Sequence, residues 1–67
     1  MSLSAELIVA GYVRLDDRDA LHDMLVHRQD LLRQLTSVTG IDPNQAIAQL
    51  SEEIAIIEAG LATLAPE

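Results

Sequence analysis

The segment Thr39-Gly40-Ile41-Asp42-Pro43 carries a helix stop followed directly by a helix start. Gly40 accepts the left-handed backbone conformation in which many helices end. Asp42 is a favoured N-cap, and Pro43 suits the first helical position because its missing N–H would have no helical partner there. We therefore expect an all-α protein with an antiparallel helical hairpin, whose helices span about residues 17–38 and 43–65.

Both flanking segments carry apolar residues at alternating spacings of three and four, which is typical of helices packed lengthwise against each other. The downstream seam consists of Ile47, Leu50, Ile54, Ile57, Leu61 and Leu64. The upstream seam consists of Leu21, Met24, Leu31, Leu35 and Val38, and a second apolar row beside it consists of Leu25 and Leu32. Because two helices cover only one such row, the second row is expected to contact another segment or another chain.

Arg28 occupies the one position of the upstream seam that should be apolar. If the two helices fold about residue 41, position 28 lies opposite position 54, and the guanidinium reaches Glu53, Glu58 or an acid on a partner chain. A paired charge in an apolar seam can fix register and partner choice. In the alternative interpretation, the stem of Arg28 packs in the seam while its charged group reaches water.

The N-terminal segment does not share the apolar face of residues 21–38. On one continuous helix, four of its apolar residues would point nearly opposite to that face; these are Ile8, Val9, Tyr12 and Val13. Asp16 and Asp17 are suitable N-caps for a new helix. We therefore expect a short helix of about residues 4–14, then a break before the long helix.

Two other arrangements of the N-terminal segment stay open. One is a single helix from Ser4 to Val38, in which Leu3, Leu7 and Ala10 extend the upstream seam. The other is a short strand at Leu7–Val13, which its β-branched residues favour but which has no sheet to join.

Three residues of the hairpin have two interpretations each. Val26 and Ile56 lie on otherwise polar faces, where they are either single exposed aliphatic residues or part of one binding surface with the N-terminal segment. Gly60, inside the downstream helix, is either a tolerated surface glycine or a point of close approach by another helix.

Length and composition indicate one small domain, residues 1–67. The chain contains no cysteine, which excludes disulfides and thiolate metal sites. The apolar content of 49% is almost entirely aliphatic, with Tyr12 as the single aromatic residue. A core of this size supplies no more than roughly 3–5 kcal/mol, so association is the remaining source of stability.

Charge and hydropathy disfavour nucleic-acid and membrane partners. Eleven acidic residues against four arginines give a net charge of −7, which is repelled by phosphates and by anionic lipid headgroups. The longest apolar stretch, Leu7–Val13, has seven residues, whereas a membrane span needs about 20. The N-terminus lacks the basic flank of a secretory signal. We expect a soluble, cytoplasmic protein.

The sequence contains no constellation that favours catalysis. Asp23, His27 and Asp30 are spaced by four and three residues, but they offer one nitrogen and two oxygens with no fourth metal ligand nearby. Ion pairs along a solvated helix face are the favoured explanation of this spacing. We therefore expect no enzymatic activity, no metal and no cofactor.

These features predict a helical protein–protein interaction module that self-associates into a helical bundle and presents an acidic surface to a larger protein. The apolar residues of the N-terminal segment and of the upstream helix, together with Arg28, are the candidates for the interface. The predicted interface residues are Ile8, Val9, Tyr12, Val13, Leu21, Leu25, Arg28 and Leu32.

Two alternatives replace the second copy by a different partner. The segment Ser51-Glu52-Glu53-Ile54-Ala55-Ile56-Ile57 resembles the aliphatic C-terminal helix of the small two-helix co-chaperones of type III secretion needle subunits. The resemblance covers only the second hairpin helix, and it implies a chaperone whose client completes the fold. The other alternative is an acidic, phage-type inhibitor that mimics nucleic acid, although here the acids are interleaved with aliphatic seams.

Overall fold

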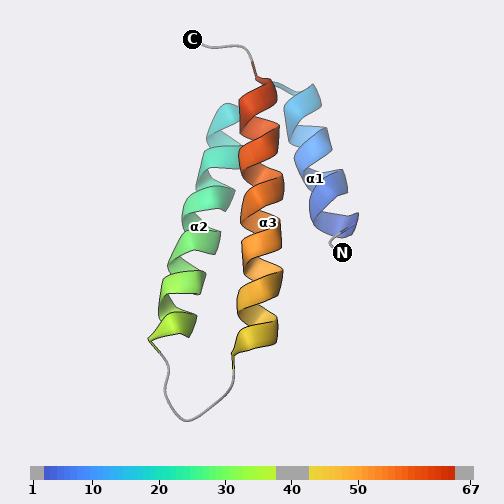
Figure 1. The fold of residues 1–67 in the computed structure, drawn as a ribbon. Helices are drawn as coiled ribbons and strands as arrows, with labels where there is room; N and C mark the ends of the chain where they lie inside the picture. The colour runs from blue at the N-terminus through green and yellow to red at the C-terminus, as the bar shows by residue number, and fades with distance from the viewer. Residues whose placement is uncertain (1–2, 38–42, 65–67) are drawn as a thin grey trace.

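The computed structural model describes residues 3–37 and 43–64, and within these ranges it contains three α-helices and no strand (Figure 1). The helices are α1 (Leu3–Arg14), α2 (Arg18–Thr36) and α3 (Asn44–Thr63). The all-α class is confirmed, and the N-terminal segment forms a separate helix rather than a strand or an extension of α2. The predicted turn at Gly40 and Asp42 lies outside the described residues.

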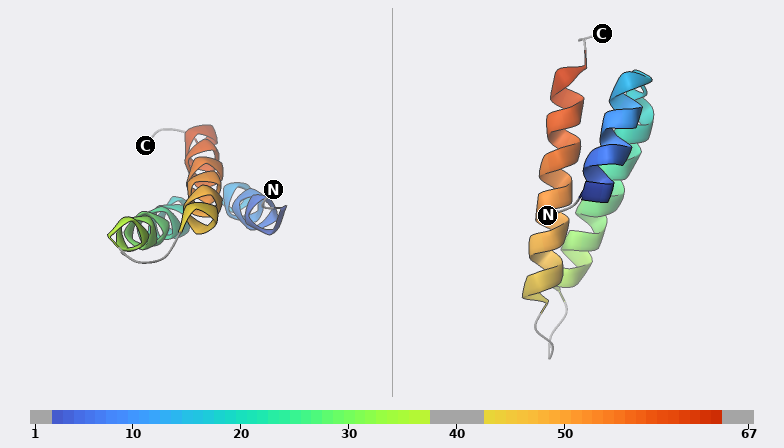
Figure 2. Two further views of the ribbon diagram at one scale, coloured as in Figure 1. Left: turned by 60° about the horizontal axis from the view of Figure 1, so that its bottom comes forward. Right: turned by 90° about the vertical axis from the view of Figure 1, so that its right-hand side faces the viewer.

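The three helices lie side by side, with α3 between α1 and α2 (Figures 1 and 2). α2 runs opposite to both of the other helices, and α1 runs in the same direction as α3. α1 contacts α3 more extensively than it contacts α2. The molecule measures 43 × 23 × 13 Å, and this flat, elongated shape leaves a large part of each helix next to solvent.

The break between α1 and α2 is a hydrogen-bonded corner. The N–H groups of Asp16 and Asp17 donate to the carbonyl oxygens of Val13 and Tyr12, both at 3.0 Å. Asp16 has a positive φ of 54°, and aspartate is one of the few residues with a side chain that tolerate this conformation. This is the Schellman pattern that ends a helix.

Asp17 also begins α2. Its Oδ1 accepts from the backbone N–H of Ala20 at 3.1 Å, so it is the N-cap that the sequence placed at Asp16 or Asp17. At the other helix start, α3 begins at Asn44 rather than at Pro43, and Pro43 occupies the N-cap position. The Pro43 carbonyl accepts from the N–H of Ile47 at 2.8 Å, whereas its ring offers no acceptor for the free N–H groups of the first turn.

The core is small and receives one buried hydrophobic side chain from each helix. Among the described residues, the buried hydrophobic side chains are Val9, Leu21 and Ile57. Partly buried residues pack around them: Tyr12, Val13, Met24, Leu25, Ile56, Leu61 and Leu64. Val9 and Leu21, both predicted at an interface between chains, therefore lie in the core of the single chain.

α1 approaches α3 most closely at Gly60. A Cβ atom built on Gly60 would overlap Cγ1 of Val9 and would lie 3.3 Å from Cγ2 of Val13. Gly60 is buried, so close approach is the correct interpretation of this glycine. Ile56, one helical turn earlier, also packs against the core. Ile56 is therefore half-buried beside α1 rather than a single exposed aliphatic residue.

Replacement of Asp17 by alanine removes the acceptor for the Ala20 N–H and is expected to lower the free energy of unfolding by about 1 kcal/mol. Asp17→Asn keeps a side-chain oxygen and should change the stability by only a few tenths of a kcal/mol. Urea unfolding followed by circular dichroism measures both variants. Equal losses for alanine and asparagine would contradict a capping role.

The contact between α1 and α3 predicts that Gly60→Ala is destabilising. Alanine favours a helix over glycine by about 1 kcal/mol, but overpacking at a close contact costs about 1–3 kcal/mol. In a Val9→Ala background, which removes the overlapping methyl group, the same substitution should become neutral or stabilising. Additive losses in the double variant would show that the two residues do not interact.

Candidate interaction surface

One side of α1 carries four exposed large aliphatic side chains. They are Leu3, Leu7, Ile8 and Leu15, which are 66%, 65%, 50% and 74% exposed. At 100° per residue these positions fall within an arc of about 140°, which also contains the exposed residues Ser4 and Arg14. Leu15 belongs to this surface because its N–H still donates to the Gly11 carbonyl at 3.1 Å and keeps it on the helical path. We call these four residues the α1 outer face.

Gly11 lies in the middle of the α1 outer face. Nothing lies within 4 Å of a Cβ atom built on it, so this glycine leaves a shallow notch between Leu7 and Leu15. The only charged residues of α1 are Glu6 and Arg14, whose charges cancel. A helix with apolar residues on all sides is normally buried, yet only the side of α1 that carries Val9 is buried within the chain.

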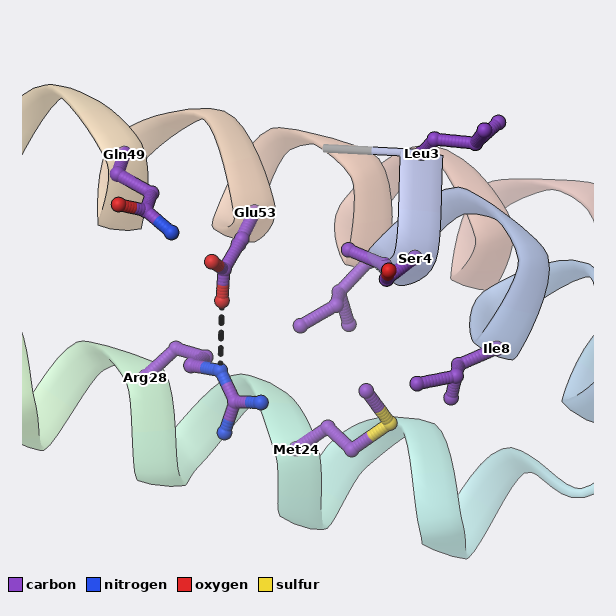
Figure 3. Close-up of a pocket in the computed structure, with 9 residues that line it drawn as sticks. Leu3, Ser4, Ile8, Met24, Arg28, Gln49 and Glu53 are labelled. Atoms are coloured by element: carbon purple, nitrogen blue, oxygen red, sulfur yellow. Dashed lines mark hydrogen bonds and ion pairs between the residues drawn. The ribbon is translucent and has the colours of Figure 1, made fainter. Parts of the chain in front are cut away.

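A pocket of about 420 Å³ borders one edge of the α1 outer face. It is lined by all three helices: Leu3, Ser4, Ala5 and Ile8 from α1, Met24 and Arg28 from α2, and Gln49, Glu53 and Ile57 from α3. Figure 3 shows the side chains of Ile8 and Met24 pointing toward each other in this pocket. The apolar end of the pocket is thus continuous with the exposed surface of α1.

An ion pair between α2 and α3 forms the polar end of this pocket. Arg28 Nε donates to Glu53 Oε1 at 2.9 Å, and the two side chains are 28% and 16% exposed (Figure 3). Arg28 Nη1 also lies 2.8 Å from Nδ1 of His27, which acts as an acceptor when it carries no proton. Of the arrangements considered for Arg28, the structure shows the pair with Glu53. The charge of Arg28 is therefore paired with an acid of the same chain.

A second groove, also of about 420 Å³, lies on the opposite edge of α1, between α1 and α3. It is lined by Glu6, Val9, Ala10, Val13 and Arg14 of α1 and by Ile56, Ala59, Gly60 and Thr63 of α3. Most of these side chains are small or apolar. The exposed apolar surface of α1 is therefore flanked by a hollow on each side.

The predicted interface residues divide into three groups in the structure. Val9 and Leu21 are buried, and Tyr12, Val13 and Leu25 pack partly against the core. Leu32 and Arg28 are also half-buried, and Arg28 pairs with Glu53. Ile8 alone lies on the α1 outer face, while Val26, the other exposed aliphatic residue considered, lies on α2 and is 43% exposed.

Sequence reasoning missed the three most exposed members of this surface, Leu3, Leu7 and Leu15. From the sequence, Leu3 and Leu7 were considered only as an extension of the upstream seam, in the alternative with a single helix from Ser4 to Val38. A signal was present, because Leu3, Leu7, Gly11 and Leu15 are spaced by four residues and form one row of a helix.

The described residues offer neither a metal site nor a membrane span. No three of their histidine and acidic side chains are grouped so that they could hold a metal ion. Asp30, one of the three residues with metal-like spacing, instead pairs with Arg33 at 3.3 Å. In the same part of the chain, none of the helices combines the length and the apolar character needed to cross a bilayer.

No protein-family model, curated protein or solved structure matches this chain.

The Arg28–Glu53 pair is expected to stabilise the contact between α2 and α3. Glu53→Gln removes the negative charge and should lower the free energy of unfolding by about 1–2 kcal/mol, since hydrogen bonds to charged groups contribute on this scale. The exposed Glu58 on the same helix provides a matched control, and Glu58→Gln should change the stability by less than about 0.5 kcal/mol. Equal effects of the two substitutions in urea unfolding would contradict this role.

Proposed function

We propose that this protein is a non-enzymatic helical interaction module that self-associates through the α1 outer face into a helical bundle. The observation that carries the proposal is the exposure of Leu3, Leu7, Ile8 and Leu15, all at least half exposed on one side of a single helix. A patch of this kind compares with the largest apolar patch on a typical monomer, and such patches often mark interaction sites.

The area of this surface fits a second copy of the chain. The four side chains together expose roughly 400–500 Å² of apolar surface, which is within the range of the largest patches on typical monomers. Two copies facing each other would bury roughly 800–1,000 Å² from these residues alone, close to the lower limit of about 1,000 Å² for specific interfaces. The walls of the two flanking grooves add further area.

The small core supports the same proposal. Only Val9, Leu21 and Ile57 are buried hydrophobic residues in the described part of the chain, and small domains commonly require an additional source of stability. Self-association supplies it, because binding that is specific to the folded state stabilises that state. In this bundle, α2 and α3 form a helical hairpin and α1 lies between the two chains.

Charge determines which surface is available for this contact. Each chain carries a net charge of −7, so two copies repel each other over most of their surfaces. α1 carries one acid and one base and α2 three of each, whereas α3 carries three glutamates and no base. Contact through α1 therefore avoids the repulsion that contact through α3 would meet. Salt should therefore strengthen self-association by screening the repulsion, and the acidic surface of α3 stays available for a larger, basic protein.

Light scattering on the purified chain tests this proposal. The wild-type protein should have the mass of a dimer or a higher oligomer. Leu7→Glu places a charge in the α1 outer face and should give a helical monomer, because Leu7 makes no part of the core. Val26→Glu adds the same charge at an exposed aliphatic residue of α2 and should leave the oligomer intact.

Two outcomes would contradict self-association through α1. A wild-type monomer with full helical circular dichroism would show that the α1 outer face stays exposed or is covered by a different protein, as the chaperone interpretation requires. An oligomer that Val26→Glu dissociates and Leu7→Glu does not would place the contact on α2 instead.

A further inference from the structure

The row of residues along the α1 outer face has a symmetry that selects one way of pairing two copies. Leu3, Leu7, Gly11 and Leu15 are placed symmetrically about position 9. In an antiparallel pair with its two-fold axis at that level, Leu3 of one chain lies opposite Leu15 of the other, and Leu7 lies opposite Gly11. A large side chain then meets the notch at Gly11 twice, once on each side of the axis.

We infer that two copies pair through antiparallel α1 helices, with Leu7 of each chain packed into the notch at Gly11 of the other; this inference rests on the proposed self-association. The unobstructed space above Gly11 permits this contact. Two-fold pairs of this kind use the same surface on both partners. Rows spaced by four residues interdigitate at a crossing angle near −50°, which concentrates the contact at the centre of the helices.

A parallel pair of α1 helices would pack the same residues less well than the antiparallel pair. It would place Leu7 against Leu7 and Gly11 against Gly11, so a crowded layer would be followed by an empty one. It would also bring the two Arg14 side chains, which are exposed, to the same level beside the contact. The antiparallel arrangement separates these charges to opposite ends of the pair and also opposes the two helix dipoles.

Disulfide trapping in this cysteine-free chain distinguishes these arrangements. Leu7→Cys and Gly11→Cys proteins are mixed in equal amounts and oxidised, and the three possible dimers are resolved by mass spectrometry. A disulfide requires Cα atoms about 4.4–6.8 Å apart, so only residues near the crossing point can form one. Ser51→Cys, at an exposed position of α3, reports the background of random collisions.

The antiparallel pair predicts that the mixed disulfide between position 7 and position 11 exceeds the half of all dimers that random pairing gives. An excess of disulfides between two position 11 residues would overturn it in favour of a parallel pair. If the wild-type chain is an oligomer but neither cysteine crosslinks above the Ser51→Cys background, this pairing is wrong while self-association stands. A monomeric wild-type protein would contradict both the antiparallel pairing and self-association.

Gly11→Leu provides a second test that does not depend on oxidation. Since nothing in the single chain lies near a Cβ at this position, the substitution should leave the helical circular dichroism of the monomer unchanged. Filling the notch should raise the dissociation constant of the dimer by about tenfold or more, which corresponds to about 1.4 kcal/mol of overpacking. An unchanged dissociation constant would contradict packing of Leu7 against Gly11.

Discussion

The contact between Val9 and Gly60 sets the rotation of α1, and the exposed surface of the protein follows from that rotation. α1 carries apolar residues on all sides, so its sequence alone leaves open which side turns inward. Because Gly60 has no side chain, α3 accepts the branched side chain of Val9 there, and Val13 lies beside it. With Val9 turned inward, Leu7 and Leu15 on the opposite side of the helix must face outward.

This geometry links the stability of the fold to its proposed function. A flat arrangement of three short helices buries few side chains completely, and among the described residues the α1 outer face holds four of the five exposed large hydrophobic side chains. Covering this face with a second copy would both add buried apolar area to each chain and build the oligomer. Folding and association of this protein are then expected to be coupled, so that its apparent stability rises with its concentration.

Local signals in the sequence predicted the helices well. The acids at Asp16 and Asp17 marked the start of α2, since a capping carboxylate acts within a few residues of its own position. Position 28 was expected opposite position 54, within reach of Glu53 or Glu58, because the register of two antiparallel helices follows from their spacing. In the structure Arg28 pairs with Glu53. The placement of α1 was not predictable in this way, because a helix that is apolar on both sides gives no periodic signal for its partner. The interface was consequently expected at Val9 and Leu21, which the single chain buries itself.

The accessibility of individual methyl groups in the wild-type protein tests self-association through α1 most directly. NMR with a soluble paramagnetic probe, recorded at high and at low protein concentration, measures it for Leu3, Leu7, Leu15 and Val26 together. Self-association through α1 predicts that the three leucine methyl groups become shielded as the concentration rises, while those of Val26 stay accessible. Leucine methyl groups as accessible as those of Val26 at every concentration would contradict it.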